Sequence, residues 1–313
     1  IYTALGLMSG TSGDGIDASI IQSDGENYHK ILLNKYTKYE TERKELILKL
    51  TDKIKNSDDL LNFKSEIDFL EEKITYDHSI IANEIISQFD LDFIGFHGQT
   101  IYHNPQNLIS KQIGSGEKLS FFTKKIVIYN FRKNDIENGG QGAPLVPIFH
   151  KVLAKKNNMD LPAAILNIGG IANITSINSD FTISSQDLGP GNCLIDKWIR
   201  LNSNENYDKN GLIARSGRLD KFILEQCLDN FYNSPISKQK SFDVSDFDFL
   251  NSFRGLSIEN GAATLTEFTS EILSKKIKGK NIYVCGGGRK NQFLIEKLQN
   301  KSGKKIKLID ELG

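Results

Sequence analysis

The most constraining feature of this 313-residue sequence is a pattern that occurs twice, in which a glycine-rich turn separates two apolar, strand-like segments. The first copy covers residues 2–20 around the turn at 9–15, and the second covers residues 163–177 around Gly169 and Gly170. A hairpin with a glycine turn therefore opens each half of the chain. This arrangement predicts two domains, which is also the usual number for this chain length.

The remaining pattern alternates between helical and strand-like periods. Apolar residues three or four apart predict a long amphipathic helix over residues 58–89, with His78 on its apolar face. Further strands are expected at 93–96 (ending at His97), 108–113, 126–129, 181–185 and 282–285, and helices at 194–201, 219–230, 257–277 and 291–299. The alternation predicts α/β domains with mixed β-sheets flanked by helices. We expect the boundary in segment 139–147 or in the helix after it, which gives domains 1–155 and 156–313.

The charge balance and the cysteine content indicate which partners to exclude and which cellular compartment to expect. The chain carries 39 basic and 39 acidic side chains, so it has no excess positive field for a nucleic acid or an anionic membrane, and we expect neither as a partner. Its three cysteines are widely spaced, which favours a reducing cytoplasmic compartment over a disulfide framework. No apolar run approaches the ~18 residues of a membrane span.

The glycine turns are candidate phosphate sites, because glycine lets a phosphate approach backbone N–H donors closely. Three segments qualify, at residues 10–15, 169–170 and 286–288, while the P-loop and dinucleotide fingerprints are absent. The first turn also offers the Thr11 and Ser12 hydroxyls and the Asp14 and Asp17 carboxylates, which suit a phosphate and Mg²⁺. The alternative is that each turn only closes a hairpin and that Asp14 serves an Asp-Gly turn.

Eight motifs, in register over nearly the whole chain, resemble one family. They are GLMSGTSGDGID at 6–17, HGQTIYH at 97–103, GGQGAPLVP at 139–147, LNIGGIANI at 166–174, DLGPGN at 187–192, YDKNG at 207–211, GAATLT at 261–266 and CGGGR at 285–289. This set is similar to that of the anhydro-N-acetylmuramic acid kinases. The resemblance implies the sugar kinase, actin and heat-shock chaperone fold, with two RNase H-like domains around an ATP cleft.

The resemblance also assigns the nucleotide site. Residues 10–17 would form the first phosphate loop, residues 167–173 the second, and 286–288 would lie beside the adenosine. The implied ATP-binding residues are Gly10, Thr11, Ser12, Gly13, Asp14, Gly15, Ile16, Asp17, Asn167, Gly169, Gly170, Asn173, Gly286, Gly287 and Gly288. Asp14 is the candidate Mg²⁺ ligand.

The implied activity is phosphorylation of O6 of 1,6-anhydro-N-acetylmuramic acid by ATP, while water opens the anhydro bridge. The product is N-acetylmuramic acid 6-phosphate, a step in recycling the bacterial cell wall. Attack by water needs a base, and the family's aspartate corresponds to Asp187. The implied contacts to the sugar are His97, Gln99, Thr100, Arg132 and Asn192, with Arg132 pairing with the lactyl carboxylate.

The sequence departs from the family at Gly13 (usually leucine), Asn130 (aspartate), Leu188 (often threonine) and Lys240 (arginine). The resemblance implies a further helix after Gly313 that returns to the first domain, and it implies a homodimer as one oligomeric state. Two alternatives keep the fold and change the function: an inactive or regulatory homologue, and an ATPase that binds a partner protein. A nicotinamide-dependent oxidoreductase lacks its glycine fingerprint.

Overall fold

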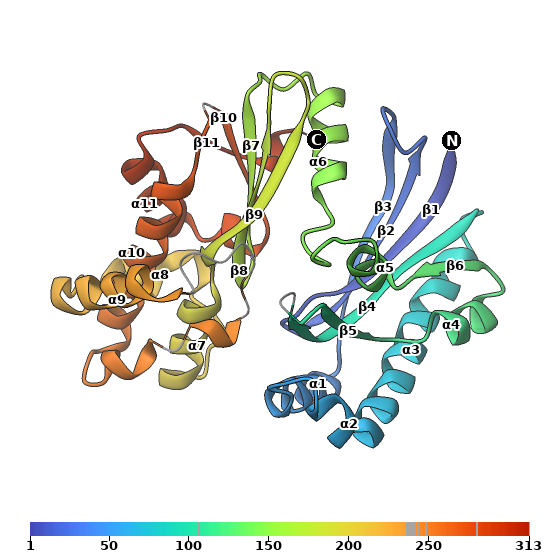
Figure 1. Ribbon diagram of the computed structural model, residues 1–313, viewed down its shortest axis with the longest axis horizontal. Helices are drawn as coiled ribbons and strands as arrows, with labels where there is room; N and C mark the ends of the chain where they lie inside the picture. Colours follow the sequence, from blue (N-terminus) through green and yellow to red (C-terminus); the bar gives the residue numbers. More distant parts are fainter. Residues whose placement is uncertain (105–106, 236–241, 243, 248, 280, 313) are drawn as a thin grey trace. The chain divides into compact units, whose positions relative to one another are not determined.

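A computed structural model of the chain describes residues 1–104, 107–235, 242, 244–247, 249–279 and 281–312. Contacts within the chain divide it into two compact units, Ile1–Leu145 and Val146–Gly313. Each unit has one mixed β-sheet with helices packed on it (Figure 1). With the division after Leu145, helix α6 (Pro147–Lys156) belongs to the second unit.

The sheet of the first unit starts from the predicted hairpin, β1 (Tyr2–Ser9) and β2 (Gly15–Ser23), which pair antiparallel. The strand β3 (His29–Lys38) pairs antiparallel with β2, and β4 (Phe93–Asn104) runs parallel to β1. The first half of β4 pairs in parallel with β6 (Ile126–Tyr129), and its second half pairs antiparallel with β5 (Ile109–Ile113). The strands alongside the first half of β4 therefore lie in the order β3-β2-β1-β4-β6, and β5 pairs with the second half of β4.

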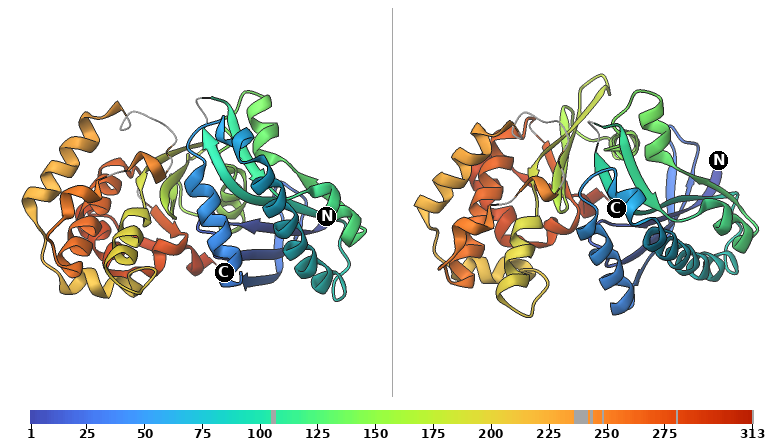
Figure 2. Two further views of the ribbon diagram at one scale, coloured as in Figure 1. Left: turned by 90° about the horizontal axis from the view of Figure 1, so that it is seen from below. Right: turned by 60° about the horizontal axis from the view of Figure 1, so that its bottom comes forward.

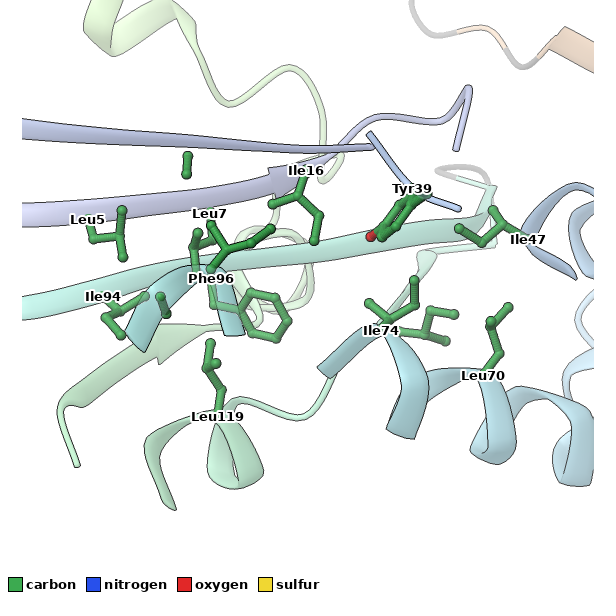
Figure 3. Close-up of a cluster of buried hydrophobic side chains, with 14 of the residues drawn as sticks. Leu5, Leu7, Ile16, Tyr39, Ile47, Leu70, Ile74, Ile94, Phe96 and Leu119 are labelled. Atoms are coloured by element: carbon green, nitrogen blue, oxygen red, sulfur yellow. The ribbon is translucent and has the colours of Figure 1, made fainter. Parts of the chain in front are cut away.

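Helices on one face of this sheet enclose the core of the first unit. They are α1 (Thr41–Lys53), α3 (Lys64–Ile86) and α4 (Gly116–Thr123), with the single turn α2 (Asp59–Asn62) between α1 and α3 (Figure 2). Figure 3 shows how strand residues such as Leu7 and Phe96 point toward Ile74 of α3 and Leu119 of α4. His78 is fully buried in α3, as predicted. The helix α5 (Phe131–Glu137) follows β6.

The second unit repeats the same topology. The strands β7 (Ala163–Ile168), β8 (Ile171–Ile177) and β9 (Ile183–Pro190) form an antiparallel meander. The strand β10 (Asn281–Cys285) is parallel to β7, and β11 (Ile306–Leu308) is parallel to β10. If β5 is left aside, both units therefore have three antiparallel strands followed in the chain by two parallel ones. Counted along the chain, these strands lie side by side as third, second, first, fourth and fifth. This is the RNase H-like arrangement, and it confirms the predicted fold class.

Apolar residues of β7, β8 and β10 pack against α10 (Ile258–Lys276) and α11 (Gln292–Ser302). A second apolar cluster is built around α10 with α7 (Cys193–Asn202), α8 (Leu212–Ser216) and α9 (Lys221–Asn233). Ala154 of α6 packs on the other side of the second sheet with Ile165 and Ile177. The buried face of each element follows from the period of its apolar residues.

Three predicted boundaries were wrong. The helix expected over 58–89 is interrupted at Phe63, which has non-helical dihedral angles between α2 and α3. The strand expected at 93–96 continues as β4 to Asn104, because Gly98, at a φ of 73°, forms an irregularity inside the strand and does not end it. The strand expected at 181–185 is β9, which extends to Pro190.

Candidate active site

The first glycine turn joins β1 to β2. Its backbone is closed by the Gly13 N–H, which donates to the Gly10 carbonyl at 3.0 Å. Gly13 has a φ of 61°, and a Cβ there would lie 2.9 Å from Cγ2 of Ile47 in α1. Glycine therefore suits this position in this chain, where the family usually has leucine. Thr11 and Ser12 are exposed at the tip of the turn.

A cation that the sequence did not reveal lies beside this turn. Lys44 of α1 forms an ion pair with Asp14, whose side chain remains 46% exposed. The Asp14 carbonyl accepts a 2.9 Å hydrogen bond from the Tyr39 N–H. Asp17 points outward from β2, and partial desolvation raises the pKa of its carboxyl. Because thirty residues separate Lys44 from Asp14, no local pattern could have indicated this pair.

Gln99 connects β4 to the same turn. Its side chain is fully buried, and its Oε1 accepts a 2.6 Å hydrogen bond from the Ser9 hydroxyl. Its Nε2 donates to the Gly10 carbonyl at 3.0 Å and to the Thr100 carbonyl at 3.1 Å. The Ser9 hydroxyl also lies 3.0 Å from the Gly15 carbonyl. Thr100, the next predicted contact, accepts through Oγ1 from the Gln112 amide at 3.2 Å.

His97 and Arg132 form a pair. Arg132, on α5, donates through Nε to His97 Nε2 at 2.8 Å and through Nη1 to the Gly142 carbonyl at 2.6 Å. Burial, with a contribution from the Arg132 charge, lowers the pKa of His97 to about 4. The imidazole is therefore neutral, with its Nδ1 proton donated to the Gly98 carbonyl at 2.9 Å. Asn130, before α5, has a φ of 61°, a conformation that asparagine tolerates well.

The second glycine turn lies against the motif that carries Asp187. The Gly191 N–H donates to the Gly170 carbonyl, and the Asn192 N–H donates to the Gly169 carbonyl, both at 2.8 Å. A Cβ on Gly191 would collide with the Gly169 carbonyl oxygen, so this close approach requires glycine. The Asn192 side chain also reaches the Gly169 carbonyl, at 3.3 Å.

Asp187 lies within β9, directly opposite Asn173 of β8. Its Oδ2 accepts a 2.9 Å hydrogen bond from the backbone N–H of Phe242. The carbonyl of the next residue, Leu188, accepts a 2.7 Å hydrogen bond from Lys276 Nζ, and burial lowers the pKa of that lysine. Phe242 and Lys276 lie far from Asp187 in sequence, and the sequence analysis did not identify them. Lys240 is outside the described residues, and Leu188 is fully buried in the core.

The third glycine segment follows β10 and adjoins the second turn. Because β10 and β7 are parallel, Cys285 pairs with Asn167, and both strands end at the same edge of the sheet. A Cβ on Gly286 would collide with the Asn167 side-chain oxygen, and one on Gly288 with the Ile168 side chain. The second unit thus brings Asn167, Gly169, Gly170, Asn173, Asp187, Asn192 and Gly286–Gly288 together. In the first unit, Gln99 contacts the turn at Gly10, Arg132 contacts His97, and Thr100 contacts Gln112.

Metal ligands and membrane-spanning helices remain to be considered. Within the described ranges, no group of three or more His, Cys, Asp or Glu residues could hold a metal ion. Oxygen atoms of a single carboxylate, completed by phosphate and water, are a common magnesium environment, and the half-exposed Asp14 carboxylate fits that donor chemistry. None of the helices in the described part of the chain is long and apolar enough to cross a membrane.

The topology of the two units and the position of their glycine turns define the class of protein. Two RNase H-like units, each with a glycine turn after its first strand, are characteristic of the sugar-kinase and actin-like ATPase fold. Ligands of such α/β sheets bind where strand ends meet turns and helices, and the glycine turn of each unit lies at such a strand end.

Comparisons with known proteins identify the family. The family model for anhydro-N-acetylmuramic acid kinase matches residues 2–312. The chain is 49% identical to the anhydro-N-acetylmuramic acid kinase of Pelagibacter ubique (strain HTCC1062), over 99% of this chain and 86% of that protein. It is 33% identical to the enzyme of the same name from Agrobacterium fabrum, over 100% and 87%. A solved ROK family glucokinase from Streptomyces griseus aligns with a TM-score of 0.41 at 9% identity, over 98% and 94%. The chain belongs to the anhydro-N-acetylmuramic acid kinase family and is a kinase.

Proposed function

We propose that this protein transfers the γ-phosphoryl group of ATP to O6 of 1,6-anhydro-N-acetylmuramic acid while water adds at C1. The products are N-acetylmuramic acid 6-phosphate and ADP, so the enzyme would serve the recycling of cell-wall sugars in the cytoplasm. The observation that carries this proposal is the family match over residues 2–312, which includes the DLGPGN motif with Asp187.

We assign Asp187 as the general base. A water molecule that attacks C1 must lose a proton as the C1–O6 bond breaks, and a carboxylate is the usual acceptor in such chemistry. The departing O6 needs no proton, because it forms the new bond to the γ-phosphorus as the bond to the ADP oxygen breaks. The Phe242 N–H supports this role, since it binds one carboxylate oxygen at 2.9 Å and so fixes the direction of the side chain.

The glycine turns would bind the nucleotide. Backbone N–H groups of residues 10–17 and 167–173 are suited to phosphate oxygens, and segment 286–288 to the adenosine. Asp14 would hold Mg²⁺, directly or through water, and the bound ion would offset the phosphate charge. The exposure of the Asp14 carboxylate supports this assignment, and Lys44, its ion-pair partner, supplies a second positive charge at the turn.

For the sugar we assign His97, Thr100, Arg132 and Asn192 as contacts. Arg132 would pair with the lactyl carboxylate, and its two hydrogen bonds, to His97 and to the Gly142 carbonyl, support a fixed orientation of the guanidinium group. The lowered pKa of His97 supports its pairing with Arg132, because only a neutral imidazole can accept the hydrogen bond from Arg132 Nε.

The test is one reaction in labelled water. The protein is incubated with Mg²⁺, ATP and 1,6-anhydro-N-acetylmuramic acid in ¹⁸O-water, and the sugar product is weighed by mass spectrometry. We expect a phosphorylated sugar that carries one solvent oxygen at C1. ATP binding without a sugar product would instead identify an inactive homologue, or an ATPase that acts on a partner protein. Phosphorylation without ¹⁸O would contradict the hydrolytic step.

A further inference from the structure

The irregularity in β4 turns Gln99 into the interior of the first unit. Ile94 and Phe96 are buried on the core side, and regular alternation would put residues 98 and 100 there too. At Gly98 the alternation shifts by one residue, so that Gln99 and Ile101 become the buried side chains that follow. A Cβ on Gly98 would collide with the Ile113 carbonyl, so the shift depends on this glycine. The irregularity at Gly98 therefore turns the polar side chain of Gln99 toward the core.

The hydrogen-bond partners fix the orientation of the Gln99 amide. Its nitrogen faces two carbonyl oxygens, those of Gly10 and Thr100, and only an NH₂ group can satisfy both. Its oxygen must then face Ser9, whose hydroxyl donates to it at 2.6 Å. The reversed amide would place three oxygens against one another. The amide is therefore satisfied by the protein itself, and its contacts converge on Ser9 and Gly10, where β1 ends and the first glycine turn begins.

We propose that Gln99 is a positioning residue for the first phosphate loop and does not contact the sugar. By holding the Gly10 carbonyl, the amide fixes the peptide planes from which the N–H groups of the loop project toward the nucleotide phosphates. Ser9 is its partner, and the Ser9 hydroxyl oxygen also lies 3.0 Å from the Gly15 carbonyl oxygen at the other end of the turn. The inference rests on the proposed function, since it takes residues 10–17 to be a phosphate loop.

The experiment separates nucleotide binding from sugar binding. Gln99→Met keeps the length of the side chain and removes its amide. The matched control is Gln22→Met, because Gln22 lies on β2 of the same sheet and donates to Thr3 Oγ1 at 3.3 Å, away from the turn. Calorimetry with Mg²⁺ and ADP measures nucleotide affinity, and steady-state rates give KM for ATP and for 1,6-anhydro-N-acetylmuramic acid. Circular dichroism and thermal melting follow folding.

We expect Gln99→Met to weaken ADP binding and to raise KM for ATP by about tenfold, which corresponds to ~1.4 kcal/mol for the one of its three hydrogen bonds that holds the Gly10 carbonyl of the loop. KM for the sugar should stay within about twofold. Gln22→Met should match the wild type. A raised sugar KM with unchanged nucleotide affinity would make Gln99 a sugar contact and overturn the inference, as would no change in either quantity.

A second variant covers the case in which Gln99→Met does not fold. Ser9→Ala keeps the glutamine and removes its partner, and it should weaken ADP binding by a smaller factor; unaltered affinity there would overturn the inference. The wild type separates the two proposals. If it binds ADP but phosphorylates no sugar, the proposed function fails while the positioning role is still measured by ADP affinity. If it binds no ADP, the loop assignment and this inference both fail.

Discussion

Replacing Asp187 by asparagine is the sharpest test of the proposed chemistry, because it removes a base and preserves its surroundings. The carboxylate accepts a 2.9 Å hydrogen bond from the Phe242 N–H, and the asparagine carbonyl oxygen can accept the same bond. The opposite strand position, Asn173, and the Lys276 hydrogen bond to the Leu188 carbonyl involve backbone that the substitution leaves in place. The variant should therefore keep its fold and its nucleotide site.

The magnitudes separate catalysis from stability. Loss of a general base costs ~10²–10⁴-fold in rate, which corresponds to ~3–5 kcal/mol of activation free energy. The folding free energy should change by only ~1 kcal/mol, because the hydrogen bond from Phe242 changes from a charged to a neutral acceptor. A fall in kcat of at least a hundredfold with near-normal ADP affinity is thus the expected result for Asp187→Asn.

The assay compares three proteins under identical conditions. Formation of phosphorylated sugar is followed by mass spectrometry, and ADP affinity by calorimetry, for the wild type, Asp187→Asn and Asp180→Asn. Asp180 is an exposed aspartate of the same unit, whose carboxylate binds the Thr182 N–H in the turn between β8 and β9. Its variant should turn over at the wild-type rate. Our reasoning is refuted if Asp187→Asn keeps its kcat within threefold, or if it loses ADP affinity in parallel with its rate.

Three further predictions follow from the same geometry. Asp14→Asn should raise the Mg²⁺ concentration needed for half-maximal rate, and an unchanged titration would make Asp14 a turn residue only. Gly191→Ala should lower the melting temperature and weaken ADP binding, since its Cβ would collide with the Gly169 carbonyl and overpacking costs ~1–3 kcal/mol; wild-type melting and affinity would argue against the close approach. Burial lowers the pKa of His78, His97 and His150 to about 4, whereas the pKa of an unfolded histidine is about 6.5. Between these two values the unfolded chain therefore binds more protons than the folded one. The stability that depends on these neutral histidines should be complete well above pH 6.5 and should fall by about 4 kcal/mol between pH 7.5 and 5.5 in urea unfolding, about 1.3 kcal/mol per histidine; equal stability at both pH values would contradict the lowered pKa values.

The pattern of apolar and turn residues predicted those elements that depend on interactions between residues close in sequence. The two glycine hairpins and the helix α10 appear where the apolar periods put them, because side-chain burial and turn chemistry act over a few residues. The pattern failed at Gly98, where a glycine next to polar residues looks like a strand end but is an irregularity within a longer strand. The strands β3 and β11, which the sequence pattern did not predict, depend on pairing with neighbouring strands, and the pattern of one segment does not contain that information.

The site divides in the same way. The glycine turns could be placed at strand ends from the sequence. The partners of the motif residues could not be placed, since Lys44, Phe242 and Lys276 come from distant segments. Gln99 illustrates the difference. Its motif indicates a functional position, but its direction depends on the register of β4 against β1, which shifts between Leu7 and Met8. The functional assignments of the individual site residues stay predictions until the variants are measured.

The repeated topology explains why both candidate clusters form at equivalent edges. In each unit the first strand and its parallel neighbour stop pairing where the first glycine-rich turn begins, so this turn adjoins the residues that follow the pairing on the neighbouring chain segment, Thr100 within β4 and Gly286 after β10. The first unit makes this contact with a side chain, the Gln99 amide on the Gly10 carbonyl. The second makes it with bare backbone, Gly286 against the side chain of Asn167 and the Ile168 carbonyl. The difference suits the two proposed roles, because a loop that cradles phosphates needs its carbonyls turned away and held, whereas a segment beside an adenosine needs room for a flat ring. A side chain at position 286 should therefore collide with Asn167, and loss of the Gln99 amide should release the Gly10 carbonyl of the first turn.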